Sequence, residues 1–195
     1  MQRCSQTSAR NFSDYRLQAR LDTSGHEGSS LPNRAITILA PHSRRIHVIV
    51  PCGSSKVWSK NPSAGPTIAR DAYVGSPFKV NRKYAECIGD QWLILSAKHG
   101  FIDPDFVLPD PYEVTFKKKS AGPIDLETLS QQIKDRRLAT FDAVIGLGGK
   151  EYRHAIETAF EGTEVALLFP FAGLPIGKAM QAAKRAAENA NTGDG

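Results

Sequence analysis

A chain of 195 residues is long enough for one domain with a sizeable core, with some residues to spare. Its hydrophobic content of 41% and charged content of 23% are ordinary for a soluble globular protein. No apolar run approaches the roughly 20 residues that span a bilayer, so we expect no membrane association.

The net charge of +5 is concentrated near the N-terminus. Residues 1–45 contain seven Lys/Arg and three Asp/Glu, whereas residues 46–195 contain eighteen and seventeen. Any anion site in the nearly neutral body must therefore be local. The run Lys117-Lys118-Lys119 is one candidate, and a solvated loop is the alternative interpretation.

The three cysteines, Cys4, Cys52 and Cys87, form neither an even disulfide framework nor a CxxC pair. The first residues lack the apolar segment of a signal peptide, so the expected compartment is the cytoplasm. No second His or Cys stands at ligand spacing from His99, and we expect neither a metal nor a cofactor.

Residues 1–33 are polar and rich in Ser, Arg and Gly, which predicts a disordered or weakly ordered arm, with a short helix over 12–21 as an alternative. Residues 34–195 are predicted to form a single α/β domain. The segment 35–39 is expected to be an edge strand or a linker.

Apolar runs and helical patterns then alternate along the chain. Strands are expected at 46–50, 92–95, 141–147 and 165–169, and helices at 77–88, 125–138, 150–160 and 175–190. Continuous apolar runs indicate strands that are covered on both faces. The prediction is a three-layer α/β/α fold around a mainly parallel sheet of four strands or slightly more.

Ligands of open parallel sheets bind beyond the carboxyl ends of the strands. The four loops expected there are PCGSSK (51–56), SAKHG (96–100), LGGKEYR (147–153) and FPFAGLPIG (169–177). Each combines glycine with a cation, a hydroxyl or an aromatic group, which suits a binding edge.

In the first loop, Gly53 and Lys56 could form an anion-binding nest, with Cys52 as a nucleophile; a tight turn with a small buried Cys52 is the alternative. The segment ARDAY (69–73) follows, in which Tyr73 could stack on a flat heterocycle while Asp71 bonds its edge. The alternative is a loop whose aromatic residues complete the core.

The stretch LSAKHGFIDPD (95–105) brings Ser96, Lys98 and His99 to the end of a strand. His99 could act as a general acid/base, and the neighbouring Lys98 would favour its neutral form. Further on, Tyr112 and Glu113 offer an aromatic ring beside a carboxylate that could activate water or steady a cationic transition state. A structural His99 and an exposed edge-strand Glu113 are the alternatives.

The run LSAKHGFIDPDFVLPDPYEVT resembles a pattern in the peroxide-stress protein family of bacteria. It is closer still to a family of small bacterial and phage proteins opening with Cys-Gly-x-x-Lys, here Cys52 to Lys56. The likeness covers about 46–180 and also rests on ARDAY, GKEYR (149–153) and GLPIG (173–177).

This resemblance implies kinship with the uracil-DNA glycosylase-like superfamily, an α/β/α fold with its site at strand ends. The loops PCGSSK and FPFAGLPIG lack the acid and the histidine of the uracil enzymes, so uracil-type catalysis is not carried over.

The leading functional hypothesis is cleavage of the N-glycosidic bond of a base, normal or modified, in DNA, in phage defence or repair. The expected catalytic residues are His99, Glu113 and Asp71. The expected base- or phosphate-binding residues are Cys52, Gly53, Lys56, Tyr73, Ser96, Lys98, Tyr112, Lys150, Tyr152 and Arg153. The alternatives are an enzyme that processes a nucleobase, nucleotide or deazapurine, and a non-catalytic DNA-binding stress protein.

Overall fold

The computed structural model of this protein describes residues 45–192. The arm predicted over 1–33 and the strand or linker predicted over 35–39 lie outside the described residues.

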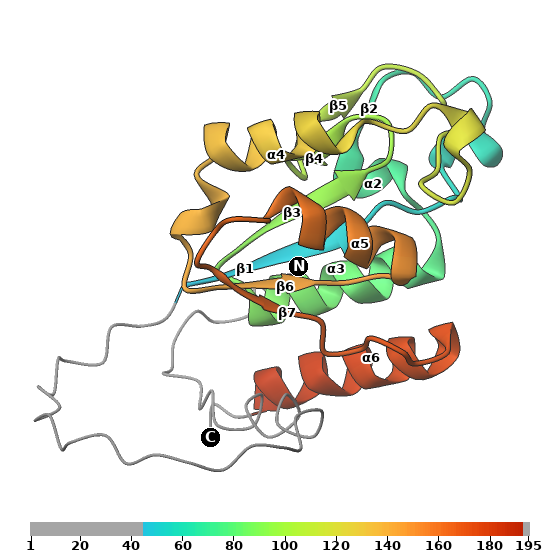
Figure 1. Ribbon diagram of the computed structural model, residues 1–195. Coiled ribbons are helices and arrows are strands. Elements are labelled where there is room, and N and C mark those ends of the chain that lie inside the picture. Colours follow the sequence, from blue (N-terminus) through green and yellow to red (C-terminus); the bar gives the residue numbers. More distant parts are fainter. Residues whose placement is uncertain (1–44, 193–195) are drawn as a thin grey trace, which may run out of the picture.

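A five-stranded, mostly parallel sheet forms the centre of the fold, in the order β4-β3-β1-β6-β7 (Figure 1). All four predicted strands are present and mutually parallel: β1 (Ile46–Pro51), β3 (Gln91–Ser96), β6 (Ala143–Gly146) and β7 (Ala166–Leu168). The fifth strand, β4 (Gly100–Ile102), runs antiparallel to β3 and was not predicted.

Two helices cover each face of this sheet, which confirms the three-layer prediction (Figure 1). Helices α3 (Ser76–Ile88) and α6 (Ile176–Thr192) pack together on one face, and α4 (Leu126–Asp135) and α5 (Lys150–Ala159) on the other. Successive side chains of β1 point to opposite faces, so Val48 and Val50 join one core and Ile49 the other. Continuous apolar runs were therefore the correct signal for a doubly covered sheet.

Helix α4 begins as the sequence predicts, because the Asp125 side chain accepts a hydrogen bond of 2.7 Å from the Thr128 amide. It ends earlier than expected, at Asp135. The rest of the predicted span contains Arg137, which has a positive φ of 53°, and a 3-10 turn, η3 (Leu138–Thr140).

Short elements at the carboxyl edge of the sheet were not predicted. They are the 3-10 turns η1 (Val57–Ser59) and η2 (Lys119–Ala121), the helix α2 (Ala69–Ala72), and an antiparallel pair formed by β2 (Thr67–Ile68) and β5 (Val107–Leu108). Within residues 45–192, no helix is both long and apolar enough to cross a bilayer.

The loops after the parallel strands meet at one edge, as predicted. The Cys52 amide donates to the Leu95 carbonyl, and the Leu147 amide donates to the Ile49 carbonyl, each at 3.0 Å. The segments 51–56, 96–100 and 147–153 therefore lie side by side, and β7 delivers 169–177 to the same edge because it is parallel to β6.

Candidate functional site

Three hydroxyl groups meet beneath the carboxyl edge of the sheet. The Tyr112 hydroxyl lies 2.8 Å from Ser96 Oγ and 2.5 Å from the Tyr73 hydroxyl. Ser96 Oγ also accepts hydrogen bonds of 3.2 Å from the amides of Lys98 and His99. Because these two bonds occupy its lone pairs, its own proton points toward Tyr112.

The tyrosines of this edge hold their protons firmly. Burial, followed by the electrostatic interaction with Cys52, raises the pKa of Tyr112 to about 12. The same causes, in the same order, raise the pKa of Tyr73 and of Tyr152. At neutral pH all three groups are therefore hydrogen-bond donors rather than anions.

Lys56 is buried with them, at 6% exposure. Its backbone pairs with Tyr73 in an isolated antiparallel bridge, and its Nζ lies 4.3 Å from the centre of the Tyr112 ring. Burial lowers the pKa of Lys56, while the negative charges of Cys52 and Glu113 oppose that shift. A buried amine facing an aromatic ring was not evident from the sequence, which suggested an open anion-binding loop.

Lys98 and His99 reach the same tyrosine from the loop after β3. The exposed Lys98 has its Nζ 5.3 Å from the centre of the Tyr112 ring, and the His99 ring meets that ring edge-on, also at 5.3 Å. Burial, followed by the charge of Lys98, lowers the pKa of His99, so the predicted preference for the neutral imidazole is confirmed in direction. His99 Nε2 is buried and has no hydrogen-bond partner among residues 45–192.

Cys52 and Tyr152 form a further contact at this edge of the sheet. Cys52 Sγ lies 3.1 Å from the Tyr152 hydroxyl, and Phe116 meets the Tyr152 ring edge-on at 5.3 Å. Gly148 permits this approach: its φ is +110°, and a Cβ there would lie 3.1 Å from Pro51 and 3.2 Å from Tyr152 Cβ.

A cavity of about 210 Å³ opens beside the cluster. Lys56, Tyr112 and Glu113 contribute to its wall, together with Trp58, Ser59, Pro62 and Pro111. It thus combines aromatic and apolar surface with an amine and a carboxylate, a mixture that is general to ligand pockets.

The structure gathers nine of the predicted residues around Tyr112 and this cavity: Cys52, Lys56, Tyr73, Ser96, Lys98, His99, Tyr112, Glu113 and Tyr152. Gly53 belongs to the same loop, where a Cβ would lie 3.6 Å from Phe78 Cβ and 3.8 Å from Tyr73 Cβ.

Three predicted residues have other contacts. Asp71 is exposed on α2 and forms an ion pair of 3.3 Å with Arg82 of α3. Arg153 forms a pair of 3.7 Å with Glu157, one turn along α5, and Lys150 is exposed at the first turn of that helix. Asp71 is therefore held by a cation rather than presented to the cavity.

Two contributors were missed from the sequence. Trp58 walls the cavity with its ring nitrogen bonded to the Ala64 carbonyl at 2.6 Å. Gln132 of α4 accepts from the Phe101 amide at 2.7 Å and donates to the His99 carbonyl at 3.1 Å, which fixes the loop carrying His99. The available signal for Gln132 was an amide on the apolar face of a helix, between Leu129 and Ile133.

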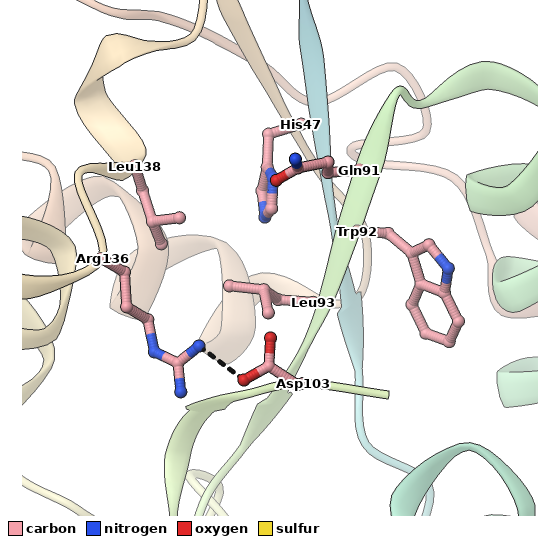
Figure 2. A pocket seen from close by; sticks show the side chains of 7 residues that line it. All are labelled: His47, Gln91, Trp92, Leu93, Asp103, Arg136 and Leu138. Atoms are coloured by element: carbon pink, nitrogen blue, oxygen red, sulfur yellow. Dashed lines mark hydrogen bonds and ion pairs between the residues drawn. The ribbon is translucent and has the colours of Figure 1, made fainter. Parts of the chain in front are cut away.

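A second cavity, of about 390 Å³, lies at the opposite, amino edge of the sheet (Figure 2). His47 points into it from β1, beside Leu93, Leu138 and the Arg136–Asp103 ion pair of 2.9 Å. It is separated from the carboxyl-edge cluster by the length of the strands. Among residues 45–192, no three His, Cys, Asp or Glu side chains gather as metal ligands.

A family model described as a family of unknown function, DUF6884, matches residues 48–185. The chain belongs to this family. It is also similar to the uncharacterized protein YfjM of Bacillus subtilis (strain 168), with 35% identity over 141 residues, which cover 72% of this chain and 93% of the relative. No solved structure matches the chain. The matched range begins within β1 and ends within α6, so it includes all the residues gathered around Tyr112.

Proposed function

We propose that this protein is a DNA glycosylase-like enzyme that cleaves the N-glycosidic bond of a base, with modified bases as the favoured substrates, in DNA. The observation that carries the proposal is the cavity in which Lys56, Tyr112 and Glu113 meet, next to an imidazole whose Nε2 has no partner among the described residues. A base flipped out of the duplex needs such an aromatic-walled pocket with polar groups at its edge.

The chemistry requires two opposite charges to be stabilised. As the glycosidic bond breaks, the sugar gains positive charge and the departing base gains negative charge. The Glu113 carboxylate at the cavity wall suits the sugar. The Lys98 ammonium and the His99 imidazole, both against the Tyr112 ring, suit the base.

The hydroxyl chain supports this division of roles. Because Tyr73, Tyr112 and Tyr152 stay protonated at neutral pH, the cluster beside the cavity adds no phenolate charge that would oppose negative charge on a leaving base. Ser96 and Gln132 hold this arrangement in place through the bonds described above. The groups are thus set before a ligand binds, which is what electrostatic stabilisation requires.

In this proposal, DNA contact falls to exposed lysines rather than to the buried Lys56. Lys98 and the run Lys117–Lys119 are exposed, the latter in the segment that follows Glu113. Phosphate contacts from such a group would hold a flipped nucleotide over the site. The kinship with the peroxide-stress proteins and the uracil-DNA glycosylase-like superfamily, a role in phage defence or repair, and a cytoplasmic location are parts of the same proposal.

The test is release of a free base from DNA. Purified protein is incubated with unmodified DNA and with phage DNAs that carry modified bases, and free bases and abasic sites are scored by mass spectrometry. Glu113→Gln and His99→Ala are expected to lower the release rate by roughly a hundredfold or more. Glu164→Gln, which changes an exposed carboxylate in the loop before β7, is the matched control. Normal turnover in both site variants would remove these residues from the mechanism.

A second candidate is an enzyme acting on a free nucleobase or nucleotide, or on a deazapurine within nucleic acid. It is favoured by the near balance of eighteen basic and seventeen acidic residues over 46–195, since duplex binding normally uses several phosphate contacts. Nucleosides and nucleotides as substrates in the same assay separate the two. DNA binding without release from any substrate would instead indicate a non-catalytic stress protein.

A further inference from the structure

Lys56 differs from an ordinary surface lysine in its burial and its contacts. Its side chain is buried, it lines the cavity of about 210 Å³, and its Nζ lies 4.3 Å from the centre of the Tyr112 ring. Its backbone bridge to Tyr73 fixes the point from which the side chain departs. Desolvated lysines are the ones that proteins use to form Schiff bases.

We propose that the Lys56 amine forms a Schiff base with C1′ of the deoxyribose, so that the protein also cleaves the DNA strand at an abasic site by β-elimination. The inference rests on the proposed function in one respect: it requires an extrahelical deoxyribose to reach the cavity. It adds a covalent intermediate and a strand-cleaving activity, neither of which base release by water would need.

The protonation state of Lys56 supports this assignment. Burial lowers the pKa of its ammonium, which raises the fraction of free amine available to attack carbon. Lys98 lies against the same aromatic ring but is exposed to solvent, where it can meet a phosphate. The two lysines therefore suit different tasks, Lys56 for the covalent step and Lys98 for attraction of anions.

The reaction balances without an oxidant or reductant. At an abasic site the sugar is an aldehyde in its open form, with a hydroxyl at C4′. The amine adds to C1′ and one water leaves, giving a protonated imine between C1′ and Nζ. Loss of a proton from C2′ forms the C2′–C3′ double bond and expels the phosphate oxygen from C3′. One water then hydrolyses the imine, restoring the amine and leaving an unsaturated aldehyde on the upstream strand.

Glu113 lies in the same cavity wall and is the group best placed to accept the C2′ proton. Lys56 lines this cavity as well, and the negative charge of Glu113 opposes the lowering of the Lys56 pKa. A carboxylate with this position would serve both activities: it stabilises the positive sugar during base release and removes the proton during elimination.

The experiment is reductive trapping on an oligonucleotide duplex with one preformed abasic site. Full-length protein is mixed with this duplex and borohydride, which reduces an imine to a stable amine. We expect a covalent protein–DNA complex, with the reduced sugar mapped by mass spectrometry to the peptide containing Lys56. Without borohydride, the strand is expected to be cut with the unsaturated aldehyde at its end.

Variants test the residue itself. Lys56→Arg keeps a cation over the Tyr112 ring but cannot form an imine, so we expect trapping and strand cleavage to be abolished while the melting temperature stays close to that of the wild type. Lys60→Arg, an exposed lysine just after η1, is the control and is expected to trap normally. Peptide mapping on the wild type decides the matter even if the Lys56 variant fails to fold.

The outcomes separate the two proposals. Free base released from DNA, with intact abasic sites and no trapped complex, would overturn the Schiff base and leave the glycosylase proposal standing. Trapping at Lys56 without base release from any DNA would overturn the glycosylase proposal and leave the Schiff base standing. A trapped complex that maps to another lysine or to the N-terminal amine would also overturn the assignment to Lys56.

Discussion

His47 is a buried imidazole at the amino edge of the sheet, 1% exposed, and neither of its ring nitrogens has a hydrogen-bond partner among residues 45–192. Its ring lies 4.8 Å from that of Phe141. Burial lowers the pKa of His47 from its ordinary value of 6.5 to about 4. The charge of Asp103 opposes this shift, and that of Arg136 adds to it. The folded protein thus keeps His47 neutral.

The sign of the pH effect follows from this lowered pKa. Below pH 6.5 the unfolded chain protonates His47 while the folded protein resists until about pH 4. The contribution of His47 to stability is therefore complete above pH 6.5, falls as the pH drops toward 4, and is constant below that. A pKa lowered from 6.5 to about 4 corresponds to a total fall of about 3 kcal/mol in unfolding free energy, of which about 2 kcal/mol occurs between pH 7 and pH 5.

Urea unfolding measured at intervals between pH 7.5 and pH 4.5 tests this prediction. His47→Phe is expected to remove most of the fall in unfolding free energy across this range, because a phenyl ring has no proton to take up. His154→Gln changes an exposed histidine of α5 and is the control, with a slope like that of the wild type. Equal slopes for the wild type and His47→Phe would refute the reasoning.

Two further predictions concern the carboxyl edge. Gln132→Ala should lower the unfolding free energy by about 1–3 kcal/mol in urea titrations, because the Phe101 amide and the His99 carbonyl would be left without their partner. Gln131→Ala, on the exposed side of α4, is the control. Equal effects of the two variants would contradict the role assigned to Gln132. Replacing Lys117–Lys119 by alanine should weaken DNA binding and reduce the slope of log affinity against log salt by about 1 for each lysine that binds a phosphate in the wild type. Fluorescence anisotropy at several salt concentrations measures both the affinity and the slope. An unchanged slope would show that these lysines do not contact DNA phosphates.

The layers of the fold were predictable because their causes are local. The run at 46–50 is continuously apolar or β-branched apart from His47, and Asp125 sits where a helix needs a cap. β4 was missed because it is only three residues long and begins at Gly100, which is typical of a loop. Gly100 has a φ of +72°, which favours glycine, and a Cβ there would also meet the Gln132 side chain, which comes from far along the chain.

The site was predictable in position but not in detail. Parallel strands bring Cys52, Ser96 and Gly148 to one edge whatever their chemistry, which the sequence already indicates. The burial of Lys56 depends on Tyr112, which arrives from a segment outside the main sheet, and no local pattern encodes that encounter. In the same way, the sequence could not show that Arg82 of α3 forms an ion pair with Asp71, which we had expected to be a free carboxylate of the site.

Ion pairs treat the arginines and the lysines of the described residues differently. Ion pairs with carboxylates engage four arginines of the described residues, since Arg70 pairs with Asp105, Arg82 with Asp71 and Glu86, Arg136 with Asp103, and Arg153 with Glu157. The ammonium groups of Lys56 and Lys98 instead face the Tyr112 ring, where no carboxylate within residues 45–192 forms an ion pair with either of them. The Glu113 carboxylate lines the same cavity as Lys56 and opposes the lowering of the Lys56 pKa. In the proposed function, Lys98 is therefore the exposed cation of this edge that a phosphate or a departing base would meet.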